Sequence, residues 1–166
     1  MKLLASIVFV GLVVAANWTT QRYGMVAGLV TAGTFAAGLT LLVRDWLQES
    51  GGRWWVFGAI ATGAGVSVWL SSPQLAAASG VAFAVSELAD FAVYSPLRGR
   101  SKAAAMAVSN TVGAVVDSLL FLAMAGFPLA SWGTQSAVKV AVTLPFIAVV
   151  VVARALFRDR VRPEGV

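Results

Sequence analysis

Residues 103–127 read AAAMAVSNTVGAVVDSLLFLAMAGF, and this stretch decides the fold class. Its residues are mainly apolar, and the only charge among them is at Asp117. A helix that crosses the hydrocarbon core of a membrane needs about 20 mainly apolar residues. The stretch therefore predicts a membrane-spanning helix that carries one acidic side chain inside it.

The composition of the whole chain agrees with that prediction. Of its 166 residues, 59% are hydrophobic and 11% are charged, whereas soluble domains average about 45–50% and about 25%. A small soluble protein exposes much of its surface and needs more polar residues than this to cover it. We therefore expect an all-α integral membrane protein with a single transmembrane domain over residues 1–166.

Five more apolar stretches predict a total of six transmembrane helices. Clusters of Gly, Pro and Ser separate them, as at Glu49–Gly52 and Ser71–Pro73, and such clusters end helices. Small residues four apart, as at Gly24 and Gly28, let helices approach closely, within the chain or in a homodimer. The predicted spans are Leu3–Ala16, Tyr23–Val43, Trp54–Leu70, Gln74–Tyr94, Ala103–Phe127 and Thr134–Phe157.

The basic residues predict the orientation of these spans. Arg22 falls on one side and Lys139 lies within the sixth span, while the other basic residues share the side of the two termini. Cytoplasmic loops carry the excess of Lys and Arg, so both termini are expected in the cytoplasm of a cell-membrane protein. The net charge of +5 then marks topology and calls for no nucleic-acid partner. The residues on the cytoplasmic side are Lys2, Arg44, Arg53, Arg98, Arg100, Lys102, Arg154, Arg158, Arg160 and Arg162.

Several kinds of chemistry are excluded by missing residues. The chain has no Cys and no His, which rules out zinc sites built on them and Ser–His–Asp or Cys–His catalysis. We find no Gly-rich phosphate loop and no metal-ligand cluster, and we expect no metal and no cofactor. A membrane enzyme would have to use an Asp pair, or a serine with Lys139, so we expect that the protein is not an enzyme.

Four ionisable residues fall inside the predicted spans: Glu87, Asp90, Asp117 and Lys139. At the bilayer centre each costs on the order of 2.5–3.5 kcal/mol by insertion scales, so each needs a partner or a task. Lys139 either faces inward toward Asp117 or a substrate, or extends to the outer headgroups. The acids pair with an inner arginine, for which Arg44 and Arg98 are candidates, bind a substrate, or form a structural charge network.

Helical spacing places these polar residues on common faces with aromatic side chains. Glu87 and Asp90 are three residues apart and share a face, and Phe83 precedes Glu87 by one turn. Asn110 and Asp117 lie two turns apart on one face, which Phe121 continues. We expect a binding cavity near the bilayer midplane between spans four, five and six, closed by span one.

Two segments resemble signatures of the queuosine-precursor transporter family, also called the vitamin uptake transporter family. The first is SELADFAVYSPLR at 86–98, and the second is SNTVG at 109–113 followed by DSLLF at 117–121. Weaker similarities lie at Asn17, at Arg44-Asp45, and at Lys139 with Pro145. The resemblance extends over nearly the whole chain.

The resemblance implies uptake of a 7-deazaguanine base, such as 7-cyano-7-deazaguanine, across the inner membrane. A guanine-like base presents an N–H and an amine side by side, and one carboxylate can accept both hydrogen bonds. We expect Asn110 to bind the carbonyl edge and a phenylalanine to stack on the ring. The expected binding residues are Glu87, Asp90, Asn110, Asp117, Lys139, Phe83, Phe121 and Asn17. A vitamin-binding subunit of an energy-coupling transporter, a membrane enzyme and a structural subunit stay open as alternatives.

Overall fold

The structure is a computed structural model that describes residues 2–143, 145 and 148. It is helical except for one short hairpin of two strands. A further helix covers residues 132–143. The other elements are α1 (Lys2–Tyr23), β1 (Met25–Val26), β2 (Val30–Thr31), α2 (Thr34–Gly51), α3 (Arg53–Leu70), α4 (Pro73–Leu97), α5 (Lys102–Ala125) and the 3-10 turn η1 (Leu129–Ser131).

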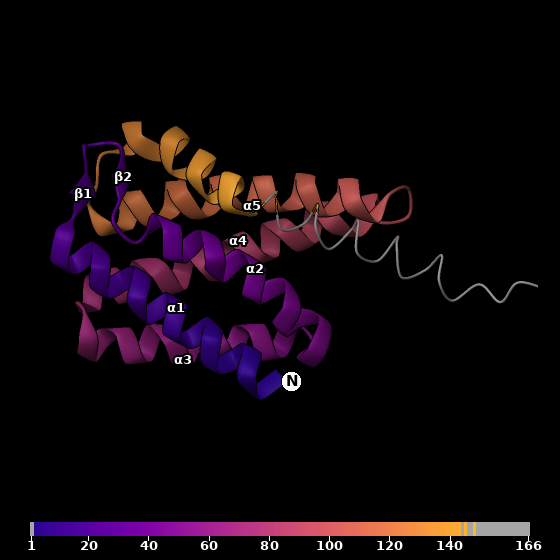
Figure 1. The fold of residues 1–166 in the computed structure, drawn as a ribbon, viewed down its shortest axis with the longest axis horizontal. Helices are drawn as coiled ribbons and strands as arrows, with labels where there is room; N and C mark the ends of the chain where they lie inside the picture. The colour runs from indigo at the N-terminus through magenta and orange to yellow at the C-terminus, as the bar shows by residue number, and fades with distance from the viewer. Residues whose placement is uncertain (1, 144, 146–147, 149–166) are drawn as a thin grey trace, which may run out of the picture.

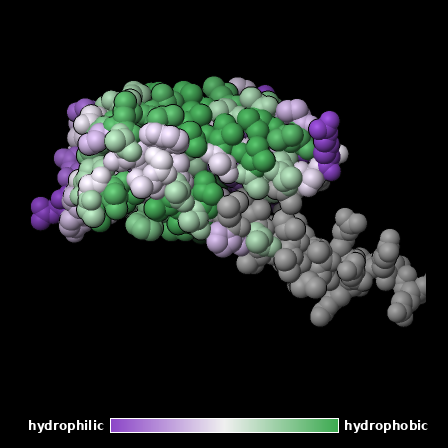
Figure 2. Space-filling view, turned by 90° about the horizontal axis from the view of Figure 1, so that it is seen from above, coloured by the Kyte–Doolittle hydropathy of each residue, from purple (hydrophilic) through white to green (hydrophobic). Residues whose placement is uncertain are grey.

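The helices run along the long axis of the molecule, and the hairpin lies at one end (Figure 1). We call this the hairpin end; the opposite end holds the start of α1 and the α2–α3 and α4–α5 turns. α4 and α5 pack against each other along their lengths, while α1 contacts both α2 and α3. Hydrophobic residues cover the middle of the face in Figure 2, and hydrophilic residues gather toward its ends. This distribution suits a bundle that lies across a membrane.

Three described helices are long and apolar enough to cross a membrane, judged by length and composition alone: Lys2–Tyr23, Pro73–Leu97 and Ala104–Ala125. The helices predicted at 54–70, 74–94 and 103–127 are confirmed as α3, α4 and α5. Caps at the starts of α4 and α5 explain their boundaries. The Ser72 hydroxyl accepts a hydrogen bond from the Leu75 amide, and the Ser101 hydroxyl accepts one from the Ala104 amide.

The predicted boundaries of the first two spans are wrong. α1 continues past Ala16 to Tyr23, and the hairpin occupies residues that the prediction gave to a helix from Tyr23 to Val43. Gly24, Ala27 and Gly28 all adopt positive φ angles, a conformation that a right-handed helix does not contain. Gly24 and Gly28 are therefore turn residues and do not form a helix-packing pair.

Glycines elsewhere allow close helix packing. A Cβ atom on Gly63 would lie 3.0 Å from Val13 Cβ, which joins α3 to α1. A Cβ atom on Gly38 would lie 3.2 Å from Val142 Cβ and 3.4 Å from Lys139 Cα. Gly38 thus brings α2 against the 132–143 helix, on which Lys139 lies.

The sixth span is described only from its start to residue 143, with residues 145 and 148 beyond. Its predicted end at Phe157, and the basic residues Arg154, Arg158, Arg160 and Arg162, lie outside the described residues. The prediction that Arg44 is one of the basic residues at the cytoplasmic surface is wrong, because Arg44 is only 3% exposed. Arg44 is part of a buried ion cluster and is not a charge at the membrane surface.

Candidate functional site

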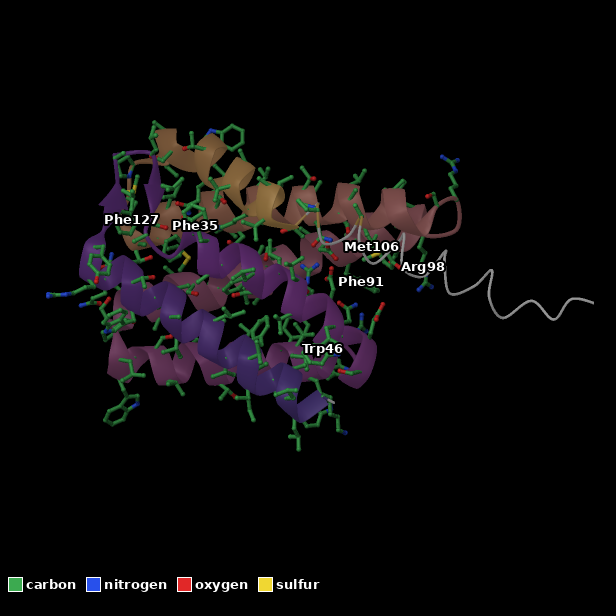
Figure 3. The ribbon with its side chains drawn as sticks, in the orientation of Figure 1. Phe35, Trp46, Phe91, Arg98, Met106 and Phe127 are labelled. Atoms are coloured by element: carbon green, nitrogen blue, oxygen red, sulfur yellow. The ribbon has the colours of Figure 1, made fainter. Side chains whose placement is uncertain are left out.

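The buried polar side chains form two separate clusters. The first borders a cavity toward the hairpin end, here called the hairpin-end cavity. The second surrounds Arg44 and is here called the Arg44 cluster; its members are Arg44, Asp45, Glu87, Asp90 and Asn110. In Figure 3, Phe127 and Phe35 mark the hairpin end, while Phe91 and Met106 lie toward the other end.

The hairpin-end cavity is narrow, and although many of its lining residues are polar, its exposed wall is mainly apolar and includes two aromatic side chains. Its volume is about 20 Å³, which is room for about one water molecule. A larger ligand therefore requires the surrounding elements to move apart. The lining residues are Ala16, Asn17, Thr20, Thr31, Gly33, Thr34, Ala37, Ser79, Phe83, Asp117, Phe121, Gln135 and Lys139.

An ion pair between Lys139 and Asp117 forms one side of this cavity. The Lys139 ammonium donates to Asp117 Oδ2 and, at 3.1 Å, to the Ser118 hydroxyl. Lys139 is 1% exposed and Asp117 is 3% exposed, so the inward-facing alternative for Lys139 is confirmed. Among the described residues, no hydrogen bond reaches the other carboxylate oxygen, Asp117 Oδ1. Toward the described residues, this oxygen therefore keeps its capacity to accept hydrogen bonds.

The hairpin covers the cavity and is held there by Gln135. The Thr31 backbone N–H donates to Gln135 Oε1 at 3.1 Å, and the Thr31 hydroxyl reaches the same oxygen at 3.2 Å. Farther out, the Thr134 hydroxyl donates to the Leu29 carbonyl at 2.6 Å. These contacts join the hairpin to the start of the 132–143 helix.

The other side of the hairpin packs tightly on α1. The Gly33 N–H donates to the Thr20 hydroxyl oxygen at 3.1 Å. A Cβ atom on Gly33 would lie 2.1 Å from the Ala16 carbonyl oxygen, so only glycine permits this approach. The polar residues at the end of α1 are therefore part of the cavity wall, which explains why the helix continues past Ala16.

Asn17 and the two phenylalanines complete the wall. The Asn17 amide nitrogen donates to the Ser67 hydroxyl at 3.0 Å. Phe83 packs against Phe9 with the ring centroids 6.2 Å apart, and Phe121 stacks on Phe127 at the same separation. The cavity thus combines flat apolar surface with hydrogen-bond donors and acceptors.

In the Arg44 cluster the guanidinium group lies among three carboxylates. Arg44 Nη2 is 2.7 Å from Asp45 Oδ1 and 3.4 Å from Asp90 Oδ1, and Arg44 Nη1 is 3.2 Å from Glu87 Oε2. Nη2 also donates to the Asn110 side-chain carbonyl at 2.9 Å. The Asn110 amide in turn donates to Asp45 Oδ2 at 3.4 Å. The cluster therefore links α2, α4 and α5.

A cleft of about 270 Å³ adjoins the cluster, with Arg44, Asp90 and Asn110 in its wall. Met106, labelled in Figure 3, also lines it. Within the part of the chain that the structure describes, no group of three or more acidic side chains is arranged to hold a metal ion. Arg44 occupies the position between the carboxylates that a cation would need.

The comparison with protein families identifies the class of molecule. Residues 3–156 match the family described as "Putative vitamin uptake transporter". The chain belongs to this family. No curated protein and no solved structure matches it. As a vitamin uptake transporter it is a multi-pass membrane protein that acts on a small-molecule substrate, and the predicted resemblance to that family is confirmed.

The predicted binding residues of this vitamin uptake transporter are divided between the two clusters. Five of them line the hairpin-end cavity: Asn17, Phe83, Asp117, Phe121 and Lys139. The other three, Glu87, Asp90 and Asn110, lie in the Arg44 cluster. The expectation that all three acids border one cavity is therefore wrong. Pairing with Arg44, one of the alternatives left open for the acids, is confirmed for Glu87 and Asp90.

Sequence reasoning missed Gln135 and Thr31 as cavity residues. Both are uncharged. Gln135 lies at the edge of a predicted span, where polar residues are ordinary, and Thr31 lies inside the helix that was predicted from Tyr23 to Val43. The available signal was the run of Thr and Gln residues beside Gly24 and Gly28, which is unusual for lipid-facing helix.

Proposed function

We propose that this transporter takes up a 7-deazaguanine precursor of queuosine, such as 7-cyano-7-deazaguanine, across the inner membrane. The resemblance of segments 86–98 and 109–121 to the queuosine-precursor signatures supports the substrate. The hairpin-end cavity supports the place of binding. The observation that carries the proposal is a buried carboxylate, Asp117, with one oxygen held by Lys139 and the other without a partner among the described residues.

The chemistry of the cavity suits the donor edge of a guanine-like base. The Asp117 carboxylate accepts from the ring N–H and the exocyclic amine, one at Oδ1 and one at the second lone pair of Oδ2, and a charged acceptor makes such hydrogen bonds strong. Lys139 pairs with Asp117 and holds its carboxylate in place. Phe83 and Phe121 provide aromatic surface for the flat ring.

The topology that fits this function has six spans and both termini in the cytoplasm, in a single transmembrane domain. α2 and α3 have 18 residues each, which at about 1.5 Å per residue gives about 27 Å, close to the hydrocarbon thickness of about 30 Å. The hairpin then lies on the outer side, where Arg22 is the basic residue, and the Arg44 cluster lies in the cytoplasmic half.

Transport then requires the two ends of the bundle to open in turn. The hairpin and α1 move apart to admit the base, because the cavity is too narrow for it in the present conformation. The Arg44 cluster holds α2, α4 and α5 together at the cytoplasmic end. Its ion pairs separate when the base leaves toward the cytoplasm.

Complementation tests the proposal. The chain is expressed in a bacterium that can neither make nor import the precursor, the precursor is supplied at low concentration, and queuosine is measured in tRNA. The wild-type chain is expected to restore queuosine. A chain that reaches the membrane and restores none contradicts the substrate. Thr62→Val is a matched control, because the Thr62 hydroxyl is exposed and bonds only its own helix, at the Gly58 carbonyl.

A further inference from the structure

Gln135 is a buried amide with a fixed orientation and one unused end. A backbone N–H can only donate, so the bond from the Thr31 amide identifies the nearer Gln135 atom as oxygen. The amide nitrogen, Nε2, must then lie on the other branch of the side chain. Gln135 is 1% exposed and lines the cavity. Among the described residues, no hydrogen bond is made by its Nε2.

Gln135 Nε2, a donor, and Asp117 Oδ1, an acceptor, together complement one edge of a guanine-type base. Gln135 and Lys139 are four residues apart on one helix face, and Lys139 binds Asp117. An amide donor and a carboxylate acceptor therefore both belong to residues that line the cavity. A guanine-type base has a ring carbonyl next to its ring N–H and amine, which is the matching order of acceptor and donors.

We propose that Gln135 determines specificity by donating from Nε2 to the ring carbonyl of the base while its Oε1 holds the hairpin. This inference rests on the proposed function and assigns to Gln135 the role that the sequence suggested for Asn110. Asn110 is engaged with Arg44 and Asp45 in the other cluster. An adenine-type base presents an amine at this position, so two donors would face each other, and a site with an unmet buried donor rejects such a ligand.

The Gln135 side-chain amide also links binding of the base in the cavity to closure of the hairpin. With the carbonyl of the base at Nε2, both ends of the Gln135 amide are fixed, and the oxygen stays on Thr31. Hydrogen bonds at one end of an amide also polarise and strengthen those at its other end. The correct base therefore stabilises the hairpin over the cavity, and a base without the carbonyl does not.

Ligand and protein changes together test the specificity. The probes are 7-cyano-7-deazaguanine and its 6-thio analogue, which keeps the N–H and the amine but replaces the carbonyl oxygen by sulfur, a weaker acceptor. Purified wild-type protein is expected to prefer the oxygen compound by about tenfold. Gln135→Glu and Gln135→Met lose this preference and bind the oxygen compound about 10- to 100-fold more weakly.

Thr19→Val is the matched control, because the Thr19 hydroxyl bonds only its own helix, at the Ala15 and Ala16 carbonyls, and Thr19 does not line the cavity. It is expected to keep the preference for oxygen over sulfur. If the Gln135 variants keep the preference too, the inference is wrong while the proposed function stands. If wild-type protein binds neither compound, both are wrong.

Deuterium exchange of residues 24–33 tests the hairpin contact without any ligand. Gln135→Glu keeps oxygen atoms for Thr31, and its hairpin is expected to exchange as slowly as that of the wild type. Gln135→Met loses them, and its hairpin exchanges at least about tenfold faster. Equal exchange in wild type and Gln135→Met would show that Gln135 does not hold the hairpin.

Discussion

The hairpin-end cavity and the Arg44 cluster both bury charged groups, yet their hydrogen-bonding states differ. In the Arg44 cluster three carboxylates and an amide surround one guanidinium. Within the described residues, three of its atoms, Arg44 Nη1, Glu87 Oε2 and Asp90 Oδ1, make ion pairs but no hydrogen bond. In the cavity, Asp117 Oδ1 and Gln135 Nε2 have no partner among the described residues, and aromatic rings lie beside them. The difference between the two regions is therefore one of charge pairing: the unbonded atoms of the Arg44 cluster lie against an opposite charge, whereas Asp117 Oδ1 and Gln135 Nε2 belong to residues that line a cavity with aromatic rings in its wall.

Locking the hairpin is expected to have the largest effect on transport. The chain has no cysteine, so Leu29→Cys with Thr134→Cys introduces the only thiols, at two exposed residues joined by the Thr134–Leu29 hydrogen bond. Cross-linking them with a short thiol reagent holds the hairpin on the cavity and is expected to abolish uptake. Uptake that continues with the hairpin fully cross-linked would mean that the base enters by another route.

Removing the cation of the Arg44 cluster is expected to reduce stability strongly. Arg44→Met leaves Glu87 and Asp90 buried beside Asp45 with no positive partner from α2, and breaking a buried pair in this way costs about 3–5 kcal/mol. Arg44→Lys keeps the charge but loses the planar group that contacts several acids at once, so its loss is smaller. Thermal unfolding in detergent measures both, and an Arg44→Met protein as stable as the wild type would mean that the cluster holds nothing together.

Changing an aromatic wall of the cavity is expected to have the smallest effect. Phe121→Leu keeps an apolar side chain but removes the ring that faces the cavity and stacks on Phe127. Aromatic pairing contributes about 0.5–1.5 kcal/mol beyond burial, which predicts binding about 2- to 10-fold weaker. Phe91→Leu is the matched control, because Phe91 lies outside the cavity and is 42% exposed. An equal loss of binding affinity in the two variants would contradict binding at the hairpin-end cavity.

Sequence patterns predicted much of this architecture because long apolar runs identify α3, α4 and α5 directly. Of the alternatives that the sequence left open for Lys139, the inward one with Asp117 as its partner is confirmed. The hairpin was missed because hydropathy does not register the positive φ angles of Gly24, Ala27 and Gly28.

The missed hairpin also explains why the position of Arg44 was predicted wrongly. With a helix assumed from Tyr23 to Val43, Arg44 fell just outside the membrane and counted as a topology signal. In the structure α2 extends to Gly51 and Arg44 lies inside the bundle. Glu87 and Asp90 pair with Arg44, whereas Asp117 pairs with Lys139. Helical spacing within α4 and α5 does not reveal this division.

The central claim is that the base binds at Asp117 and not at the acids of the Arg44 cluster. Calorimetric titration of purified protein with 7-cyano-7-deazaguanine tests it most directly. The double variant Asp117→Asn with Lys139→Met removes both charges of the cavity pair and so leaves neither buried alone, while Glu87→Gln changes only the Arg44 cluster. We predict that the double variant folds and binds at least about 100-fold more weakly, and that Glu87→Gln binds within a few-fold of wild type. Full binding by the double variant, with binding lost in Glu87→Gln, would contradict the account.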